Sequence, residues 1–402
     1  MSNDDFCRKA EAYLKKLCGV RPHRRLGSPG NHQATEFFAG TIGRWGYEID
    51  AAPFKCLDHV IRKSSLMCVR RRFEAFASPY SPGCDVEAEL AVVGDVEQLE
   101  ACNRRGRVLL LHGEITAEQL MPKNFVFYNP DHHKKIYGLL EKKQPAAIIT
   151  ATEKKPELVG AIYPFPMIED GDFDIPSMYC RETVGADLAE HAGEVVRVFI
   201  DAKRIPSTGC NVIAWKNRPA KKKIVISAHI DARETTPGAS DNASGVVVLL
   251  LLAEMLKDYA GGMGVEIAAL NGEDHYSVAG QMDYLRRFEK EFERTAVAVN
   301  IDDVGYRKGK TAYSMYECQA HLKRKLGATL GQRRGIMEGP IWYQGDHMMF
   351  VQSGVAAVAL TAEKAAELMK TVTHTEKDTP DLIDCRKLVE LAGALRDFVV
   401  QG

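Results

Sequence analysis

The C-terminal half of the chain consists of short apolar runs separated by longer mixed segments. Strands that are buried on both faces have this pattern, which is typical of a largely parallel sheet covered by helices. The segment GVVVLLLLAEML (245–256) is apolar on nearly every side and predicts a buried helix. We therefore expect an α/β fold here. Its strands are predicted at NVIAW (211–215), IVISA (224–228), VEIAAL (265–270), AVAVNI (296–301) and AAVALT (356–361).

The first two hundred residues follow other patterns. Residues 4–18 and 32–46 carry apolar positions at helical spacing, and residues 47–56 have the mixed character of a strand. From about residue 73, short apolar runs alternate with polar, Pro- and Gly-containing connectors, and a helix is expected over 132–142. This region predicts a smaller β-rich α+β module. Its apolar runs lie at 90–94, 107–113, 146–150 and 195–200.

Composition and charge exclude several classes of protein. The 402 residues include 53 Lys+Arg and 54 Asp+Glu, so the formal net charge is −1, which argues against nucleic-acid binding and against a polybasic membrane-surface protein. The longest apolar run, from Val246 to Ala253, is far shorter than the roughly 20 residues that span a bilayer. The charged N-terminus lacks a signal-peptide core, and the ten cysteines form no CxxC pair. We therefore expect a cytoplasmic protein with reduced thiols and no structural cysteine zinc site.

Acids and histidines follow the apolar runs of the C-terminal half. In an open α/β sheet the carboxyl ends of the strands meet at one crevice, so these side chains are expected to converge. Several carboxylates at one place repel one another unless they share protons or bind a cation. A mixed set of histidines and carboxylates suits zinc or a similar divalent ion. The converging set is predicted to be His229, Asp231, Glu273, Asp274, Asp302, Asp303 and His374.

The motifs that contain these residues resemble the signature of the M28 family of dizinc aminopeptidases. Five motifs match in the family's order over about residues 229–378, namely HID, PGASDNASG, NGED, NIDDVG and THTEKDT. Any one of them alone is a weak signal, whereas chance agreement of all five is remote. The resemblance implies a zinc-exopeptidase-like fold with a three-layer α/β/α architecture and a mixed, mostly parallel sheet.

The resemblance also implies a role for each matching position. Asp241 matches the carboxylate that bridges two zinc ions. Glu273 matches the general base, which takes a proton from the metal-bridging water as that water attacks the peptide carbonyl. Asp231 matches a residue that fixes the orientation of a histidine. The other implied ligands are His229 and Asp302 for one zinc, and Asp274 and His374 for the other.

Some positions depart from the commonest family pattern or are less specific. The paired acids are usually both glutamates, whereas here they are Glu273 and Asp274. The segment GDHMMF (345–350) resembles the family's Ser-Asp-His loop near the substrate pocket, so His347 is expected to contact the substrate. For Asp303 a structural role is the favoured interpretation, and receiving the substrate's amino group is the alternative. Two Zn²⁺ ions are expected, with Co²⁺ or Mn²⁺ as alternatives because ligand type alone discriminates weakly among them.

The middle of the chain resembles the protease-associated domain that some members of the family insert before the catalytic strands. The expected division is a discontinuous catalytic domain, residues 1–72 and 203–402, with an inserted protease-associated-like domain at 73–202. Within the inserted region, His132 and His133 are expected to be a surface pair rather than metal ligands.

Three functions remain open on the sequence alone. The first is a metallo-exopeptidase that releases N-terminal amino acids from peptides. The second is a carboxypeptidase or dipeptidase on the same scaffold, and the third is a noncatalytic binding protein that retains the fold. No GxSxG motif and no catalytic-cysteine context is present, so a covalent mechanism is not expected. A peptide is the expected partner, and the sequence predicts no oligomeric state.

Overall fold

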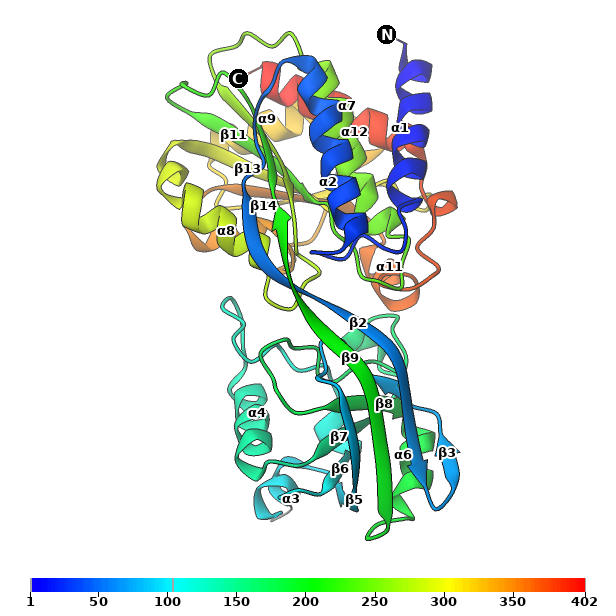
Figure 1. Cartoon of the computed structure of the whole chain (residues 1–402). Coiled ribbons are helices and arrows are strands. Elements are labelled where there is room, and N and C mark those ends of the chain that lie inside the picture. Colours follow the sequence, from blue (N-terminus) through cyan, green and yellow to red (C-terminus); the bar gives the residue numbers. More distant parts are fainter. Residues whose placement is uncertain (1, 103–104, 402) are drawn as a thin grey trace. The chain divides into compact units, whose positions relative to one another are not determined.

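The computed structural model describes residues 2–102 and 105–401, which fall into two compact units. Unit 1 comprises Met1–Cys56 and Ser207–Gly402, and unit 2 comprises Leu57–Pro206 (Figure 1). The first division lies earlier than the expected 72/73 because strand β2 (Pro53–Cys68) continues without a break into unit 2. There β2 pairs with β3 (Arg71–Phe73) and neighbours β9 (Val195–Cys210). The chain passes between the units only through β2 and β9.

Unit 1 is built on an eight-stranded mixed sheet with the order β1-β10-β12-β11-β13-β16-β14-β15. The four central strands run parallel, and the strands toward the edges pair antiparallel except for β15, which is parallel to β14. This confirms the expected α/β class. The strands are β1 (Glu48–Asp50), β10 (Val212–Lys216), β12 (Gly264–Leu270), β11 (Lys223–His229), β13 (Thr295–Ile301), β16 (Ala357–Ala362), β14 (Thr311–Tyr316) and β15 (Ile336–Glu338).

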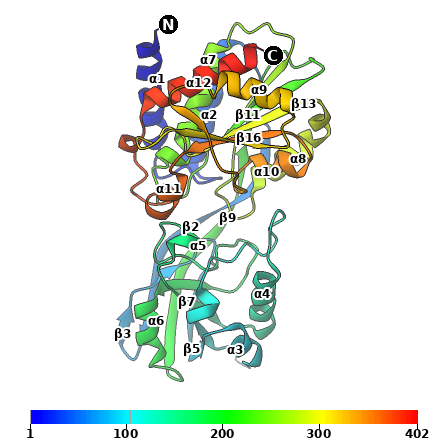
Figure 2. The same cartoon turned by 180° about the vertical axis from the view of Figure 1, so that it is seen from behind.

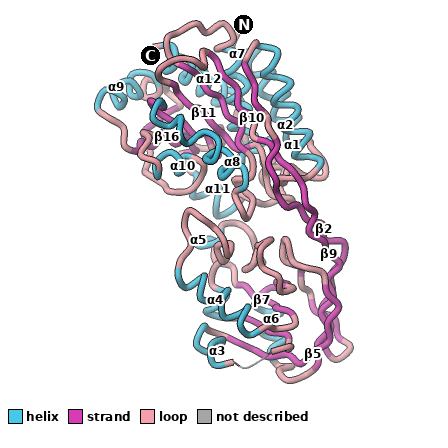
Figure 3. The backbone as a smooth tube through the Cα atoms, turned by 60° about the vertical axis from the view of Figure 1, so that its left-hand side comes forward, coloured by secondary structure: helices cyan, strands magenta, loops and turns pink. Residues whose placement is uncertain are grey.

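Helices cover both faces of this sheet (Figures 1, 2 and 3). Successive side chains of a strand point to opposite faces, so β10 contributes to both layers. Its Ala214 lies in the large core, and the next residue, Trp215, packs against Phe288 of α8 with ring centroids 6.0 Å apart. The large-core layer contains α1 (Asn3–Cys18), α2 (Pro29–Ile42), α7 (Ser244–Met255), α9 (Ala320–Thr329) and α12 (Cys385–Val400), and the other contains α8 (Ala279–Phe288) and α10 (His347–Gln352).

Two helices of unit 1 illustrate how the sequence determines them. In α7 every side chain from Ser244 to Glu254 is buried, as the uniformly apolar pattern predicts. Helix α2 begins earlier than the expected residue 32 because Ser28 caps it by accepting from the Asn31 N–H, with Pro29 at the first helical position. The remaining short elements of unit 1 are η1 (Gly43–Trp45), η3 (Ala239–Ala243), η4 (Glu289–Arg294), α11 (Ala365–Thr371) and η5 (Pro380–Leu382).

Unit 2 is a second sheet, ordered β3-β2-β9-β5-β6-β7-β8-β4, with an apolar cluster on each face. In β6, Leu110 faces the cluster that contains Leu188 of α6, and Leu109 faces the cluster that contains Leu140 of α4. The expected β-rich α+β module therefore forms, and its identity as a protease-associated domain stays a prediction. The elements not yet given are β4 (Phe76–Ala77), β5 (Cys84–Val93), α3 (Val96–Ala101), β6 (Val108–Leu111), η2 (Gly113–Thr116), α4 (Asp131–Lys143), β7 (Ala147–Thr152), α5 (Pro156–Val159), β8 (Ser177–Arg181) and α6 (Glu182–Ala189).

None of the helices in residues 2–102 and 105–401 has the length and apolar character that crossing a bilayer requires.

A buried charge network ties the sheet of unit 1 to α8. Glu266, in the middle of β12, is 0% exposed and accepts hydrogen bonds from Lys223 Nζ at 2.7 Å and from Trp215 Nε1 at 2.8 Å. The hydroxyl of Tyr284 donates to its other oxygen. The Lys223–Glu266 pair is stable because every polar atom around the carboxylate has a partner. Removing Glu266 would leave the Trp215 N–H and the Tyr284 hydroxyl without this acceptor. The buried Lys223 ammonium would keep only the partly exposed Glu291, whose Oε2 atom lies 3.1 Å from it.

The substitution Glu266→Ala is therefore expected to lower the free energy of unfolding by about 3–5 kcal/mol. Urea or guanidinium titration followed by circular dichroism measures this change. The matched control is Lys222→Ala at the neighbouring exposed position, for which we expect a change within about 0.5 kcal/mol. A loss below about 1 kcal/mol for Glu266→Ala would contradict the assigned role of this network.

Candidate metal centre

One half of the candidate site forms where β11 and β13 end. His229 is the last residue of β11, and Asp302 directly follows β13. These neighbouring parallel strands bring the His229 Nε2 atom to 3.5 Å from Asp302 Oδ1. The same Nε2 atom lies 3.1 Å from Oδ1 of Asp241, which the loop between β11 and α7 supplies.

The other half forms around His374. Its Nε2 atom lies 3.0 Å from Oδ2 of Asp241 and 2.9 Å from Oδ1 of Asp274, which follows β12. Asp241 therefore directs one oxygen at each histidine and stands between two groups of ligand atoms. The sequence prediction placed Asp241 between the same two pairs, His229 with Asp302 and Asp274 with His374.

The loop that carries Asp241 is tied to the end of β13. The peptide bond between Asp241 and Asn242 is cis. The Asn242 amide group donates to the Ile301 carbonyl at 2.8 Å and accepts from the Gly245 N–H at 3.0 Å. A Cβ at Gly245 would lie 2.4 Å from Asn242 Oδ1, so only glycine fits there. These contacts fix Asp241 relative to Asp302.

Asp231 anchors the loop that carries Glu273 and Asp274. Its carboxylate accepts the backbone N–H groups of Gly272, Glu273 and Asp274 at 2.7, 3.3 and 3.1 Å. Its Oδ1 atom is also 3.6 Å from His229 Nδ1, a distance at which the contact is electrostatic rather than a hydrogen bond. The orienting of a histidine by Asp231 stays a prediction. The hydrogen bonds of its carboxylate instead position the backbone of the acidic pair.

The side chains gathered here perturb one another's protonation. Burial lowers the pKa of His374, but the carboxylates of Asp274 and Asp241 outweigh burial and raise that pKa to about 10. Burial raises the pKa of Glu273 well above its usual value, and the charges of Asp274 and Asp302 raise it further. Burial also raises the pKa of Asp302. A cluster with this surplus of buried carboxylate has the electrostatics of a cation site.

The donor set also fits divalent ions. Among the described residues, His229 Nε2, Asp302 Oδ1 and Asp274 Oδ2 are buried atoms without a hydrogen-bond partner. Ligand atoms of His229, Asp241 and Asp274 all lie within 4.8 Å of one another. Imidazole nitrogens and carboxylate oxygens are the ligands that zinc takes at catalytic sites, so the residues present fit the expected ions.

The two residues predicted to contact substrate differ in their surroundings. The closeness of Asp241 and Asp302, added to burial, raises the pKa of Asp303 well above its usual value. His347 is 0% exposed, lies between the rings of Tyr316 and Trp342, and contacts the Trp342 carbonyl at 3.1 Å. Burial lowers its pKa to about 4. This geometry gives His347 a structural role in its loop, and a substrate contact stays a prediction for both residues.

Three buried residues near the site were not assigned a role from the sequence. Asp346 accepts from Gln281 Nε2 at 2.6 Å, and burial raises its pKa to about 7. Asp378 and Arg24 hold the loop that carries Asp241. Asp346 and Asp378 lie inside the motifs GDHMMF and THTEKDT, so the sequence contained a signal from which they could have been assigned to the site. No motif points to Arg24.

His133, in unit 2, departs from the expected surface pair. His132 is exposed, but His133 is buried and its Nδ1 atom accepts the Met121 N–H at 3.0 Å. A neutral ring that accepts at Nδ1 carries its proton on Nε2, which lies 3.1 Å from Glu118 Oε1. His133 therefore donates to Glu118, and its Nε2 atom is not free to bind a metal.

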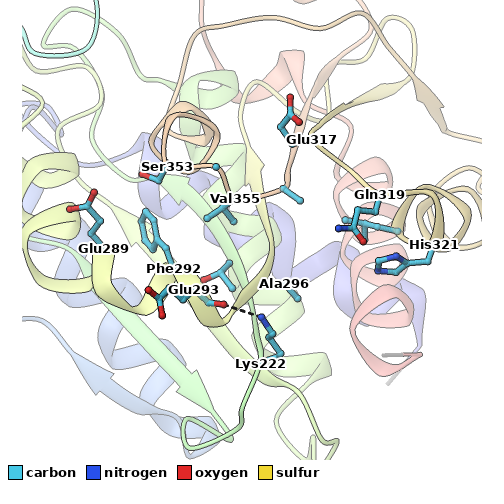
Figure 4. A pocket seen from close by; sticks show the side chains of 14 residues that line it. Lys222, Glu289, Phe292, Glu293, Ala296, Glu317, Gln319, His321, Ser353 and Val355 are labelled. Atoms are coloured by element: carbon cyan, nitrogen blue, oxygen red, sulfur yellow. Dashed lines mark hydrogen bonds between the residues drawn. The ribbon is translucent and has the colours of Figure 1, made fainter.

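A separate hollow lies elsewhere in unit 1. It has a volume of about 650 Å³, and Figure 4 shows Lys222, Glu293 and Glu317 among its lining residues. Thr295 and Ala296, the first residues of β13, line it, whereas the predicted ligand Asp302 follows the last residue of that strand. The hollow contains none of the predicted site residues and has charges of both signs, so it is not the candidate site.

Comparison with known proteins identifies the domain that carries this cluster. The sequence profile of peptidase family M28 matches residues 211–399. These residues form an M28 peptidase domain. The matched range thus includes all five predicted ligands, Glu273 and the buried helix α7.

Relatives of the M28 domain include named aminopeptidases. The chain is 28% identical over 236 residues to aminopeptidase YwaD of Bacillus subtilis, which is 56% of this chain and 50% of that protein. It is 25% identical over 244 residues to the probable leucine aminopeptidase 2 of Aspergillus oryzae, 57% of this chain and 44% of that protein. The aligned part thus spans half or less of the length of these curated relatives.

Solved structures share the architecture over nearly the whole chain. An aminopeptidase from Aneurinibacillus sp. strain AM-1 superposes with a TM-score of 0.75 at 23% identity, covering 98% of this chain and 93% of that one. BSAP, a zinc aminopeptidase from Bacillus subtilis, has a TM-score of 0.75 at 19% identity, covering 98% and 94%. Because both identities are below 25%, these superpositions are evidence for the fold alone. They confirm the zinc-exopeptidase-like fold that the M28 resemblance implied.

Proposed function

We propose that this chain is a dizinc exopeptidase that releases N-terminal amino acids from peptides. The observation that carries the proposal is the position of Asp241, whose two oxygens face two separate histidines at 3.1 and 3.0 Å. One carboxylate between two ligand groups is the arrangement that holds a pair of ions. The names of the relatives, which include aminopeptidases and a zinc aminopeptidase, support both the ion and the direction of attack.

Each ion would be held by one histidine and one aspartate besides the shared Asp241. His229 and Asp302 belong to one position, and Asp274 and His374 to the other. When bound, the ions polarise the substrate carbonyl and increase the acidity of the attacking water. Zinc is the proposed ion, and Co²⁺ or Mn²⁺ are alternatives that the same ligands accept.

Glu273 moves the proton in the proposed mechanism. It is half-buried and directly precedes Asp274 in the chain, and its backbone is held by Asp231. Its carboxylate accepts a proton from the attacking water and delivers it to the amine that leaves, so that no covalent intermediate with the protein forms. Because Asp231 binds the N–H groups of three successive residues, the base and the adjacent ligand Asp274 are positioned by one side chain.

The alternative functions are separable by experiment. The fold also occurs in a glutaminyl cyclase from Porphyromonas gingivalis, with a TM-score of 0.53 at 13% identity, so architecture alone does not choose the reaction. The presence of all five ligands and the base argues against a noncatalytic binding protein. A cytoplasmic location is proposed from the sequence alone, because its ten cysteines form no CxxC pair.

We expect aminoacyl chromogenic substrates to be cleaved and their N-acetylated counterparts to be left intact. Activity should disappear with 1,10-phenanthroline and return with added Zn²⁺, because the residues alone supply no Lewis acid. A peptide with N-terminal glutamine distinguishes hydrolysis from cyclisation by product mass. Equal cleavage of blocked peptides, or activity that survives chelation with no bound metal, would overturn the proposal.

A further inference from the structure

The loop that carries Asp241 is held from one side by a buried carboxylate. Asp378, which is 0% exposed, accepts the Ser240 N–H at 2.7 Å through Oδ1 and the Asp241 N–H at 3.0 Å through Oδ2. Its backbone carbonyl accepts the Ala239 N–H at 3.2 Å. Three consecutive amides of the loop therefore point at one residue, which determines the direction in which the Asp241 side chain leaves the backbone.

The same loop is held from its other side by a buried guanidinium. Arg24 is 3% exposed and donates to the carbonyls of Pro237 and Gly238 at 2.7 and 2.9 Å. It also donates to Ile230, just after β11, and to Leu17 at the end of α1. A Cβ at Gly238 would lie 2.7 Å from Arg24 Nη2, so the loop approaches Arg24 more closely than any residue but glycine allows.

Asp378 also links two ligands of the proposed site. It lies four residues after His374 on the same loop, and its own N–H donates to the Thr375 carbonyl at 3.1 Å. By binding the backbone of Asp241, it ties the His374 loop to the Asp241 loop. The 3.0 Å separation of His374 Nε2 from Asp241 Oδ2 thus depends on contacts made by a residue that carries no ligand atom.

We propose that Asp378 and Arg24 are positioning residues that set the geometry of the shared carboxylate Asp241 and thereby the affinity for the ion pair. The inference rests on the proposed function, because it takes Asp241 as a ligand to two ions. Groups that orient metal ligands typically change metal affinity 10–100-fold when they are replaced. The substitution Asp378→Asn keeps the size of the side chain, but its NH₂ group must face one of the two backbone N–H donors.

The test measures metal binding directly on the full chain. The protein is stripped with a chelator and titrated with Zn²⁺ against a chromogenic competitor, and Co²⁺ absorption spectra report the ligand geometry. Asp378→Asn is expected to weaken affinity about 10–100-fold and to change the Co²⁺ spectrum. Arg24→Lys keeps a buried positive charge but cannot reach the four carbonyls, so it is expected to act in the same direction.

The matched control is Glu266→Gln. It makes the same acid-to-amide kind of change at a buried residue with three donors, but away from the ligands, since Glu266 pairs with Val225, four residues before His229 on β11. It should lower the melting temperature without changing Zn²⁺ affinity or the Co²⁺ spectrum. If Asp378→Asn fails to fold, Arg24→Lys carries the comparison, since it retains the charge.

Wild-type Zn²⁺ affinity in folded Asp378→Asn and Arg24→Lys, or a loss equal to that of Glu266→Gln, would overturn the inference. In that case the proposed function still holds if the wild-type protein binds two Zn²⁺ ions tightly. A wild-type chain that binds no ion pair would instead overturn the proposed function and this inference together.

Discussion

Replacing Glu273 with glutamine is expected to lower kcat roughly 10²–10⁴-fold while both metal positions keep their ions. Glutamine has nearly the size of glutamate but cannot accept a proton, so it removes the transfer and leaves the ligands in place. The backbone N–H of residue 273, which donates to Asp231, is unchanged by the substitution. Steady-state kinetics with an aminoacyl substrate and elemental analysis of the same samples measure the two quantities.

The matched control for this experiment is Glu376→Gln. Glu376 is exposed and lies on the His374 loop, so the same chemical change close to the site should leave kcat within about twofold of wild type. Near-wild-type activity of Glu273→Gln would show that the proton passes through another group. A loss of metal from this variant would instead make Glu273 a ligand.

The substitution Asp241→Asn is expected to reduce the metal content at both positions and to abolish detectable hydrolysis. Each Asp241 oxygen faces a different histidine, and the neutral amide presents one oxygen and one NH₂ group in their place. One side of the cluster would lose its ligand atom, and both sides would lose the negative charge that holds cations. Elemental analysis after dialysis against buffer with limiting zinc measures the result.

Asp302→Asn is the comparison for Asp241→Asn. Asp241 contacts both histidines, whereas Asp302 contacts His229. The substitution Asp302→Asn should weaken mainly one of the two ions. Retention of two full equivalents by Asp241→Asn would remove its role between the ions, and identical metal loss in both variants would mean that the two positions do not bind independently.

The structure brings together the residues that the sequence predicted as ligands, and their role as ligands stays a prediction. Their closeness was predictable because much of it is decided at strand ends. His229, Asp302 and Asp274 each follow a buried strand, so identifying the strands was enough to bring them together. Residue type then indicated a cation. The mixed, mostly parallel sheet of unit 1 was expected from the same near-continuous apolar runs and, with its three layers, from the resemblance to the M28 family. The strand order was not predicted and comes from the structure.

The contacts that hold these ligands were not predictable in the same way. Arg24 lies more than 200 residues before the Pro237 and Gly238 carbonyls that it binds. In the sequence it is one of three arginines in RPHRR (21–25), which look like solvated charges. His133 is buried next to an exposed His132, which a histidine pair on a polar helix does not reveal. The first boundary of unit 1 was predicted at 72/73, whereas the structure has it at Cys56/Leu57. The boundary lies inside the single strand β2 (Pro53–Cys68), and the composition of the chain changes only after that strand ends.

The interrupted order of unit 1 has a consequence for synthesis on the ribosome. Unit 2, Leu57–Pro206, is continuous in sequence and has its own two apolar clusters, so its parts are complete as soon as it emerges. Helix α1 must wait for α7 and α12, because Leu14 packs into a core that they supply. At roughly 5–20 residues per second, that wait lasts from about twenty seconds to more than a minute. Throughout it, the apolar face of α1 lacks the core against which it packs in the finished fold.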